Sequence, residues 1–462
     1  MLWPRAVRGL PTLVDWRVLG ECRTARANVV CVTSIRTPLA GIYPFRSPEP
    51  AGAVVLHDGN VAVRVGDEVV EAPGKLWLSV EDGLDVRWSV DLRLPLGPVE
   101  LLIDRPELGR SSVAGVVSNT GGTGYVPGAG VGDSSRLSRV VVHWFNLPAI
   151  LPAEPLEIPG GSHAGRWVCE AMGWKLIVDK RPDHTAAVEE ARGTAIAVFT
   201  HVADLERVDG AKFTSQDAKR VLYGWQVALS FATGRWVAPA LPVGLDADGK
   251  RVWEEWGSWR CSRYHGYFRW WDTIRSQDLG EFCRAFFEHW LDPRCHDALR
   301  YTAHHSICAS SDQATLEAKV MLAQAGFEYL AWVTNVLEGG RSAGKYKALS
   351  TDEKLSEMLD DAGISKTIPA EFGALSALAP IDKQSGPKAI TWLRNRLVHP
   401  KDAGEPYRVE SALAQCWMLS VEYLDLLLLH RLGYRGQYLP RRSDTWAHAS
   451  VAVPWASGEG WT

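Results

Sequence analysis

A short basic stretch near residue 400 combines side chains that could carry out acid–base chemistry on a phosphate ester. Residues 392–401, WLRNRLVHPK, place Arg394, Asn395 and His399 close together. An imidazole titrates near neutrality, so it can remove or donate a proton. A guanidinium is planar and permanently charged, so it can hold a phosphate and offset developing charge. With Asn395 orienting the histidine or a phosphate oxygen, these residues fit metal-independent RNA cleavage by attack of the ribose 2′-OH.

The spacing of the arginine and the histidine carries little information by itself. Arg-x4-His occurs four times in the chain, whereas its composition predicts about one occurrence by chance. Only the pair Arg394/His399 has an asparagine after the arginine and a proline after the histidine. On a helix Asn395 and His399 lie about 40° apart, and Pro400 ends the helix there. A plainer interpretation stays open, in which these cations complement a helix dipole.

Positive charges near the motif favour an anionic partner. The formal net charge is −4, so any nucleic-acid site must be local. Two stretches without acids carry these charges: Lys388, Arg394, Arg396 and Lys401 in the first, and Arg431, Arg435, Arg441 and Arg442 in the second. We expect Arg396, Lys401, Arg431 and Arg435 to bind the substrate.

Helices must position this motif. Seven residues are spaced alternately by four and three, which predicts a first helix that ends at Gly339-Gly340. These residues are Leu316, Val320, Ala323, Phe327, Leu330, Thr334 and Leu337. Further helices are expected at about 351–362, 385–399 and 407–432. The last is apolar on nearly all faces and needs more than one packing partner. We therefore expect an additional interface there, in a homodimer. Two chains would supply two histidines, one as acid and one as base.

The residues before this helical domain predict strands. The fold class is multidomain α+β, with a β-rich domain at 1–205, a mixed tryptophan-rich segment at 206–310 and the helical domain at 311–462. Val86, Trp88, Val90 and Leu92 alternate on one face of a strand. WKLIVD and GTAIAVFTHV are further strand candidates.

Turn and loop signals divide this front part. Hairpins are expected around Asp58-Gly59 and Asp248-Gly249. A helix capped near Thr214 or Ser215 should end at Gly234. The segment 109–132 is rich in glycine and serine without a phosphate-binding pattern, so we expect a long loop there.

Bulk properties indicate a cytoplasmic protein. The 462 residues exceed one usual core, and 46% hydrophobic with 23% charged residues is typical of globular chains. The start lacks the apolar run of a signal peptide. No stretch reaches the roughly 18 apolar residues of a membrane span; the longest candidate is interrupted by Asp425 and His430. The eight cysteines are dispersed without C-x-x-C, which fits a reducing compartment.

Two other clusters are more typical of structural residues. A zinc site is conceivable among Cys295, His296, His304, His305 and Cys308. Paired ligand spacings are missing there, so we expect neither a metal nor a cofactor. The stretch WRCSRYHGYFRWW interleaves Arg260, Arg263 and Arg269 with aromatic residues. It could stack bases, but a core at a domain junction is the commoner arrangement.

The Arg394-Asn395-x-x-x-His399 pattern resembles the R-N-x-x-x-H motif of HEPN-domain proteins, a match that covers about 312–445 with the tail LLLLHRLGYRGQYLPR. The resemblance implies a four-helix bundle and a dimeric, metal-independent endoribonuclease in which Arg394 and His399 are the catalytic pair and Asn395 their companion. Glu328 is similar to an acidic position found on the first helix. A β-rich front half before such a domain looks like the layout of ApeA-type abortive-infection proteins.

Two functions follow as expectations. The first is an endoribonuclease acting on RNA, for example tRNA, in an anti-phage or toxin role, with the front half responding to a phage or antitoxin trigger. The second is a binding protein without enzymatic activity. Its helical domain would serve dimerisation, and its β-rich part would bind a ligand, a protein or a nucleic acid.

Overall fold

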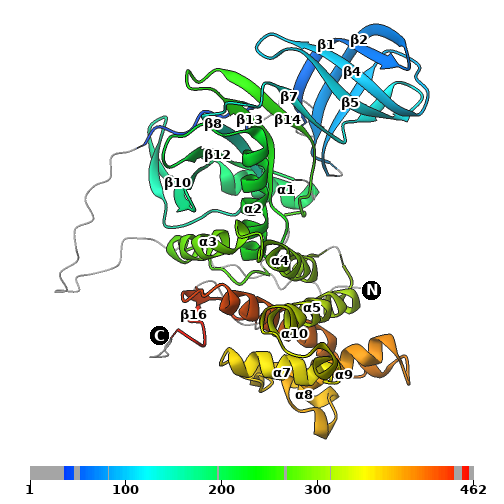
Figure 1. Ribbon diagram of the computed structural model, residues 1–462, viewed down its shortest axis with the longest axis vertical. Helices are drawn as coiled ribbons and strands as arrows, with labels where there is room; N and C mark the ends of the chain where they lie inside the picture. Colours follow the sequence, from blue (N-terminus) through cyan, green and yellow to red (C-terminus); the bar gives the residue numbers. More distant parts are fainter. Residues whose placement is uncertain are drawn as a thin grey trace, which may run out of the picture. The chain divides into compact units, whose positions relative to one another are not determined.

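The front part of the chain forms a closed β-barrel. A computed structural model describes residues 36–45, 53–81, 83–194, 197–264, 268–312, 314–441 and 450–456. The barrel strands are β1 (Val54–Val65), β2 (Glu68–Ser79), β3 (Leu84–Val90), β4 (Gly97–Arg105), β5 (Gly109–Asn119) and β6 (Thr123–Tyr125). They run in the order β2-β1-β4-β5-β6-β3, and β3 also pairs with β2, which closes the ring (Figure 1). Closure leaves no free strand edge in the ring.

The first barrel hairpin turns at a different place from the one predicted. Strand β1 runs without interruption through Asp58-Gly59, so the hairpin expected there was wrong. The turn lies at Gly66-Asp67, where Gly66 adopts a φ of 61°. Glycine reaches this left-handed region without steric cost, which explains the position of the turn.

The glycine-rich segment 109–132 is not the long loop that was expected. It contains β5, β6 and β7 (Gly128–Gly132). Val113 and Val117 of β5 point into the barrel core beside Trp88, whose inward position with Val86 and Val90 was predicted. At Gly124 a Cβ atom would lie 2.5 Å from Cζ2 of Trp88. Glycine therefore makes room for a buried indole here.

Replacing Gly124 with alanine is expected to lower the free energy of unfolding by about 1–3 kcal/mol, because the added methyl collides with the carbonyl oxygen of Val116 and overpacks the site against Trp88. Urea unfolding followed by circular dichroism measures this. Gly128→Ala is the matched control, since a Cβ there meets no atom within 4 Å. Equal stabilities of the two variants would contradict the close packing.

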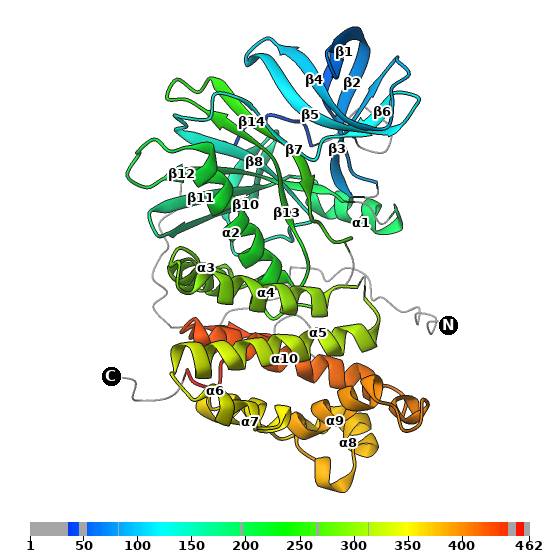
Figure 2. The same ribbon diagram turned by 45° about the vertical axis from the view of Figure 1, so that its right-hand side comes forward.

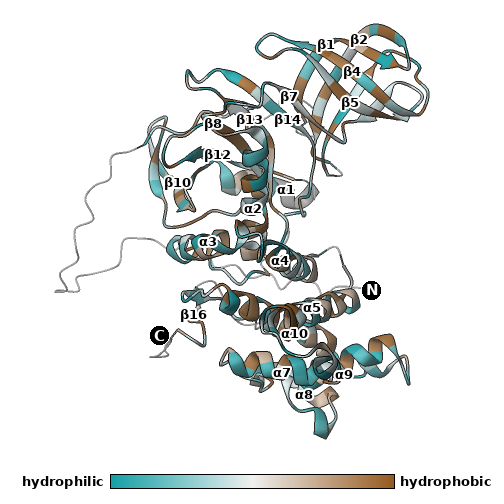
Figure 3. Ribbon diagram, in the orientation of Figure 1, coloured by the Kyte–Doolittle hydropathy of each residue, from teal (hydrophilic) through white to brown (hydrophobic). Residues whose placement is uncertain are grey.

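A second antiparallel sheet follows the barrel. Its strands run in the order β14 (Arg251–Trp259), β13 (Ala238–Leu245), β8 (Arg139–Phe145), β12 (Phe199–Arg207), β11 (Trp174–Lys180), β10 (Gly161–Ala171) and β9 (Glu154–Ile158), with β7 paired to β14. Residues Ser258 and Trp259 of β14 also pair with β3. The β8 run VVVHWF is buried, and its hydrophobic part is brown in Figure 3. Because β13 and β14 belong to this sheet, the sheet crosses the boundary expected at 205.

Turn and cap predictions in this part are confirmed. The hairpin between β13 and β14 turns at Asp248-Gly249, with φ 76° at Gly249. Helix α2 (Ser215–Thr233) has Thr214 as its N-cap in a capping box with Asp217, and it ends at Gly234. The other helices of this part are α1 (His184–Thr194), α3 (Ser276–Trp290) and α4 (His296–Ser310).

The chain after residue 311 is helical, which confirms a mixed α/β fold with a β-rich front and a helical end. Its elements are α5 (Leu316–Trp332), the π-helix η2 (Val333–Glu338), α6 (Ala343–Lys347), α7 (Thr351–Asp361), η3 (Ala370–Phe372), α8 (Gly373–Leu378), η4 (Ile381–Lys383), α9 (Gly386–Val398), η5 (Glu405–Tyr407), α10 (Ala412–Arg431) and the strand pair β15 (Gln437–Tyr438) and β16 (Val451–Ala452). Helices α5 and α10 lie side by side above α7 and α9 (Figure 2).

Helix α10 is buried on every side within the chain itself. All residues from Leu419 to Leu429 are buried, and α10 contacts α4, α5, α8 and α9. By length and composition alone α10 could cross a membrane, and 78% of that window is buried in the protein. The need for several packing partners was correct, but the partners are intramolecular. The apolar surface of α10 therefore gives no argument for a dimer.

Candidate active site

Helix α9 is held by its apolar face. Ala389, Ile390 and Leu393 are fully buried, and the helix contacts α5, α7 and α10. At its first residue, Gly386, a Cβ atom would lie 2.9 Å from ring atoms of Tyr423 on α10. Glycine allows this close approach, and the motif residues are left on the less buried face of the helix.

Helix α9 ends at the motif histidine, as predicted. The N–H of His399 donates to the carbonyl of Asn395 at 2.8 Å, and the backbone leaves helical geometry at His399 (φ −126°, ψ 68°), directly before Pro400. The His399 side chain is exposed. In the described part of the chain, no hydrogen bond or ring contact of its imidazole is observed. The ring is accessible to a substrate.

Arg394 and Asn395 contact each other. Nη1 of Arg394 donates to Oδ1 of Asn395 at 3.1 Å. The Nε of Arg394 is buried and has no hydrogen-bond partner among the described residues. A guanidinium with donors left over can bind a further acceptor, such as a phosphate oxygen. The structure thus pairs two of the three motif side chains, while the His399 side chain contacts neither.

A small cationic cavity lies beside Asn395. Its volume is about 220 Å³, and its lining residues are Asp352, Lys383, Lys388, Thr391, Trp392, Asn395 and Arg396. The cations Lys383, Lys388 and Arg396 line it together with one carboxylate, that of Asp352. The Oγ1 of Thr391 is buried without a partner among the described residues. Pockets for whole ligands measure roughly 300–1,000 Å³, so this cavity suits a single group such as a phosphate.

Arg396 is fixed at the rim of this cavity. Its Nε lies 2.9 Å from a carboxylate oxygen of Glu405, without the geometry of a hydrogen bond. Its guanidinium lies 5.8 Å from the centre of the Trp392 ring. Charge attraction and ring stacking therefore hold it in place. Lys401 is exposed, two residues beyond His399.

Arg431 is the last residue of α10 and pairs with an acidic side chain. Arg431 forms two hydrogen bonds with Glu338, at 2.6 and 2.8 Å. The motif helix α9 contacts η5, which comes before the first residue of α10. Twenty residues of helix span about 30 Å. Substrate binding by Arg431 and Arg435 stays a prediction, and the Arg431 guanidinium is already paired with Glu338.

The second basic stretch is also interrupted by a buried ion pair. Nη2 of Arg441 lies 2.5 Å from Oδ2 of Asp425, and both side chains are 2% exposed. Arg442 lies outside the described residues. So do Tyr267 of the aromatic stretch and Cys22 and Cys31 of the eight cysteines. Arg441 is a structural residue, so this stretch is not a continuous basic surface.

The Cys and His residues near 300 do not converge. Among the described residues, no group of three His, Cys, Asp or Glu side chains could hold a metal. His304 contacts the hydroxyl of Tyr223 at 3.0 Å, and His296 contacts the carbonyl of Trp290 at 2.9 Å. Desolvation lowers the pKa of His304 to about 4.

The aromatic stretch after residue 259 belongs to the core. Trp270 and Trp271 are fully buried. Phe268 stacks on Trp417 of α10 with 4.1 Å between ring centroids. The guanidinium of Arg260 covers the ring of Trp236. These contacts support the structural interpretation of this stretch.

Sequence reasoning missed part of the cavity. Thr391 lies three residues after Lys388 and four before Asn395, so these residues share one helix face. That periodicity could have identified Thr391. Asp352 on α7 and Lys383 on η4 reach the cavity only through tertiary packing. Glu328 contacts Thr351, the residue before Asp352.

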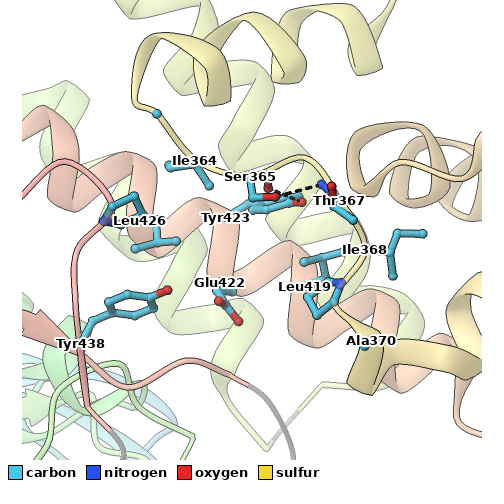
Figure 4. Close-up of a pocket in the computed structure, with 13 residues that line it drawn as sticks. Ile364, Ser365, Thr367, Ile368, Ala370, Leu419, Glu422, Tyr423, Leu426 and Tyr438 are labelled. Atoms are coloured by element: carbon cyan, nitrogen blue, oxygen red, sulfur yellow. Dashed lines mark hydrogen bonds between the residues drawn. The ribbon is translucent and has the colours of Figure 1, made fainter.

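A second cavity of about 360 Å³ in the helical region does not include the motif. Figure 4 shows the carboxylate of Glu422 between Tyr438 and Leu419. Glu422 is buried and accepts a hydrogen bond of 3.0 Å from the N–H of Arg441. The segment Gly363–Ala370 supplies other lining residues. This cavity is therefore separate from the candidate active site.

Comparison with known proteins places two parts of this fold. Residues 132–267, which contain β8–β14 together with α1 and α2, match the YopA central domain. Residues 292–452, which contain the motif, match the YopA C-terminal domain. Neither match indicates the HEPN family or an ApeA-type layout.

One curated relative also matches. The chain is 28% identical over 286 residues to the "SPbeta prophage-derived uncharacterized protein YopA" of Bacillus subtilis (strain 168). The match covers 60% of this chain and 63% of that protein, less than two thirds of its length. No solved structure matches significantly. In its central and C-terminal parts the chain is therefore similar to YopA, a prophage-derived protein.

Proposed function

We propose that the protein is a metal-independent endoribonuclease with Arg394, Asn395 and His399 as its catalytic residues. The observation that carries the proposal is the end of α9. An exposed imidazole there follows an Arg394–Asn395 pair that adjoins a cationic cavity. In this proposal α5, α7, α9 and α10 form a HEPN-type bundle, and Arg396 and Lys401 guide the RNA backbone.

The proposed reaction needs one base and one acid. A histidine takes the proton of the ribose 2′-OH, the 2′-oxygen bonds to phosphorus, and the bond from phosphorus to the 5′-oxygen breaks. A second group protonates the departing 5′-oxygen. The products are a 2′,3′-cyclic phosphate and a 5′-hydroxyl. Arg394 offsets the negative charge on the phosphoryl oxygens.

One chain supplies one motif histidine, so we propose a homodimer as the source of the second. The argument is the chemistry alone, because α10 is covered within the chain. A cytoplasmic role in phage defence or as a toxin is part of the proposal. The prophage origin of its relative supports such a role.

Incubating the purified chain with tRNA and total RNA in EDTA is expected to give cleavage with 2′,3′-cyclic phosphate ends. Mass spectrometry of the fragments identifies these ends. Cleavage that EDTA abolishes would contradict a metal-free mechanism. Light scattering at the same concentration gives the oligomeric state, and a monomer that cleaves would exclude the dimer.

A second candidate is a non-catalytic binding protein, in which the helical region only dimerises. It is favoured by one observation: among the described residues, the imidazole of His399 forms no hydrogen bond with the Arg394 guanidinium or the Asn395 amide. If no RNA is cleaved in the assay above, even with extracts of phage-infected cells, this second function replaces the first.

A further inference from the structure

The outer face of the barrel carries a row of two aromatic side chains with an arginine between them. Trp77 of β2 is directly opposite Arg87 of β3, and Arg87 is directly opposite Tyr125 of β6. The neighbouring residues Leu76 and Leu78 point into the core. Because side chains alternate along strands, the three residues share the outer face. Cross-strand neighbours lie about 4.5–5.5 Å apart, so the row is continuous.

This row borders a hollow of ligand size. The hollow has a volume of about 540 Å³, and its other lining residues are Asp85, Trp88, Ser118, Thr123, Gly124 and Ser258. The Tyr125 side chain is 41% exposed, and Trp77 is half-buried. A large aromatic side chain left partly in water beside a hollow is a feature of binding surfaces.

The floor of the hollow is rigid. Trp88 is fully buried beneath it, and its Nε1 donates to the carbonyl of Tyr125 at 3.2 Å. Gly124 lets the strand pass close over that indole. The Oγ of Ser118 donates to the carbonyl of Thr123 at 3.3 Å. Side chains on a fixed backbone need little reorganisation to bind a ligand.

We propose that this surface, the Trp77–Arg87–Tyr125 platform, binds single-stranded RNA. Flat aromatic rings stack on bases of any sequence, and arginine adds charge attraction to the phosphates. The carboxylate of Asp85 can accept from base amino groups, and the nearby hydroxyls can bond the ribose 2′-OH. The choice of RNA over DNA rests on the proposed function, whereas the stacking argument does not.

The platform is distinct from the candidate active site. Trp77, Arg87 and Tyr125 lie before both segments that match YopA, and Ser258 of the hollow lies within the first segment. The platform would hold a strand while the end of α9 acts on it. Binding and cleavage can therefore be tested separately.

The test uses the full chain with His399→Ala, so that RNA is not consumed. Fluorescence anisotropy with a labelled 15-nucleotide uridine strand measures the Kd. Trp77→Ala and Tyr125→Ala are each expected to weaken binding about ten-fold or more. Trp77→Phe keeps a ring and should stay within about three-fold. Val70→Ala is the control, an exposed residue of the same strand outside the hollow.

Two outcomes would overturn the platform. One is an unchanged Kd for the Trp77→Ala/Tyr125→Ala double variant, with circular dichroism showing the native fold. The other is binding of a proline-rich peptide but not of RNA. Tighter binding of a 15-nucleotide deoxyuridine strand than of the uridine strand would overturn the assignment to RNA. None of these results depends on cleavage. The EDTA assay therefore tests the proposed ribonuclease activity separately.

Discussion

His399→Ala is expected to lower the rate of RNA cleavage by about 10²–10⁴-fold, the usual contribution of a general acid or base. Arg394→Ala should cost about 10²–10³-fold, since it removes a donor that offsets charge at the phosphate. The His399 side chain is exposed and lies past the end of α9, so its loss should leave the fold intact. Single-turnover cleavage of a labelled RNA measures the rates, and circular dichroism checks the fold.

The chain offers a matched control for this experiment. Arg284 and His289 have the same spacing on α3, and Nδ1 of His289 lies 3.0 Å from the carbonyl of Ala285. His289→Ala should leave cleavage unchanged. Equal losses in the His289 and His399 variants would show that the motif has no special role. Full activity of His399→Ala would remove the proposed mechanism.

Arg441→Met is expected to lower the free energy of unfolding by about 3–5 kcal/mol, because it leaves the Asp425 carboxylate buried without its charge partner. Both side chains are 2% exposed. Nε and Nη2 of Arg441 donate to Oδ2 of Asp425, and Oγ of Ser306 donates to Oδ1 at 2.5 Å. Chemical denaturation at pH 7.5 measures the loss.

The pH dependence of this variant follows from the carboxyl group. Burial raises the pKa of Asp425, and Arg441 opposes that rise. Without Arg441 the folded pKa moves further above the unfolded value of about 3.9. The folded state then holds a proton that the unfolded state releases. Stability therefore falls as pH rises from the unfolded to the folded pKa, and the variant should be closest to the parent near pH 4.

A double variant separates the charge effect from lost packing. Adding Asp425→Asn to Arg441→Met removes the unpaired charge and keeps a partner for Ser306. The double variant should be more stable than Arg441→Met alone, and its loss smaller than the sum of the single losses. Strict additivity would show that the pair does not interact.

Local signals were sufficient where the chain's own neighbours decide the structure. The capping box of Thr214 and Asp217 and the terminal Gly234 define α2. The spacing of apolar residues predicted α5, α7, α9 and α10. In each case, hydrogen bonds or contacts within a few residues determine the element, so the sequence alone predicts it.

Predictions failed where distant partners decide. The glycines of segment 109–132 suggested a loop, yet Gly124 lies in a strand, where the Val116 carbonyl and the Trp88 ring leave no room for a side chain. Asp58-Gly59 suggested a turn, yet pairing with β2 continues through it. The same limit applies to the site. Residue types predicted the end of α9, but only the fold shows Arg431 paired with Glu338 at the other end of α10.

The shared interior of the two YopA-like segments has an evolutionary consequence. Trp225 and Trp253 of the first segment and Leu299 and Leu424 of the second belong to one hydrophobic cluster. Neither segment could be acquired by recombination without leaving part of that interior open to water. We therefore expect the two segments to be inherited together. The barrel core also shares a cluster with Val141 and Trp256 of the first segment, so the same constraint extends to β1–β6.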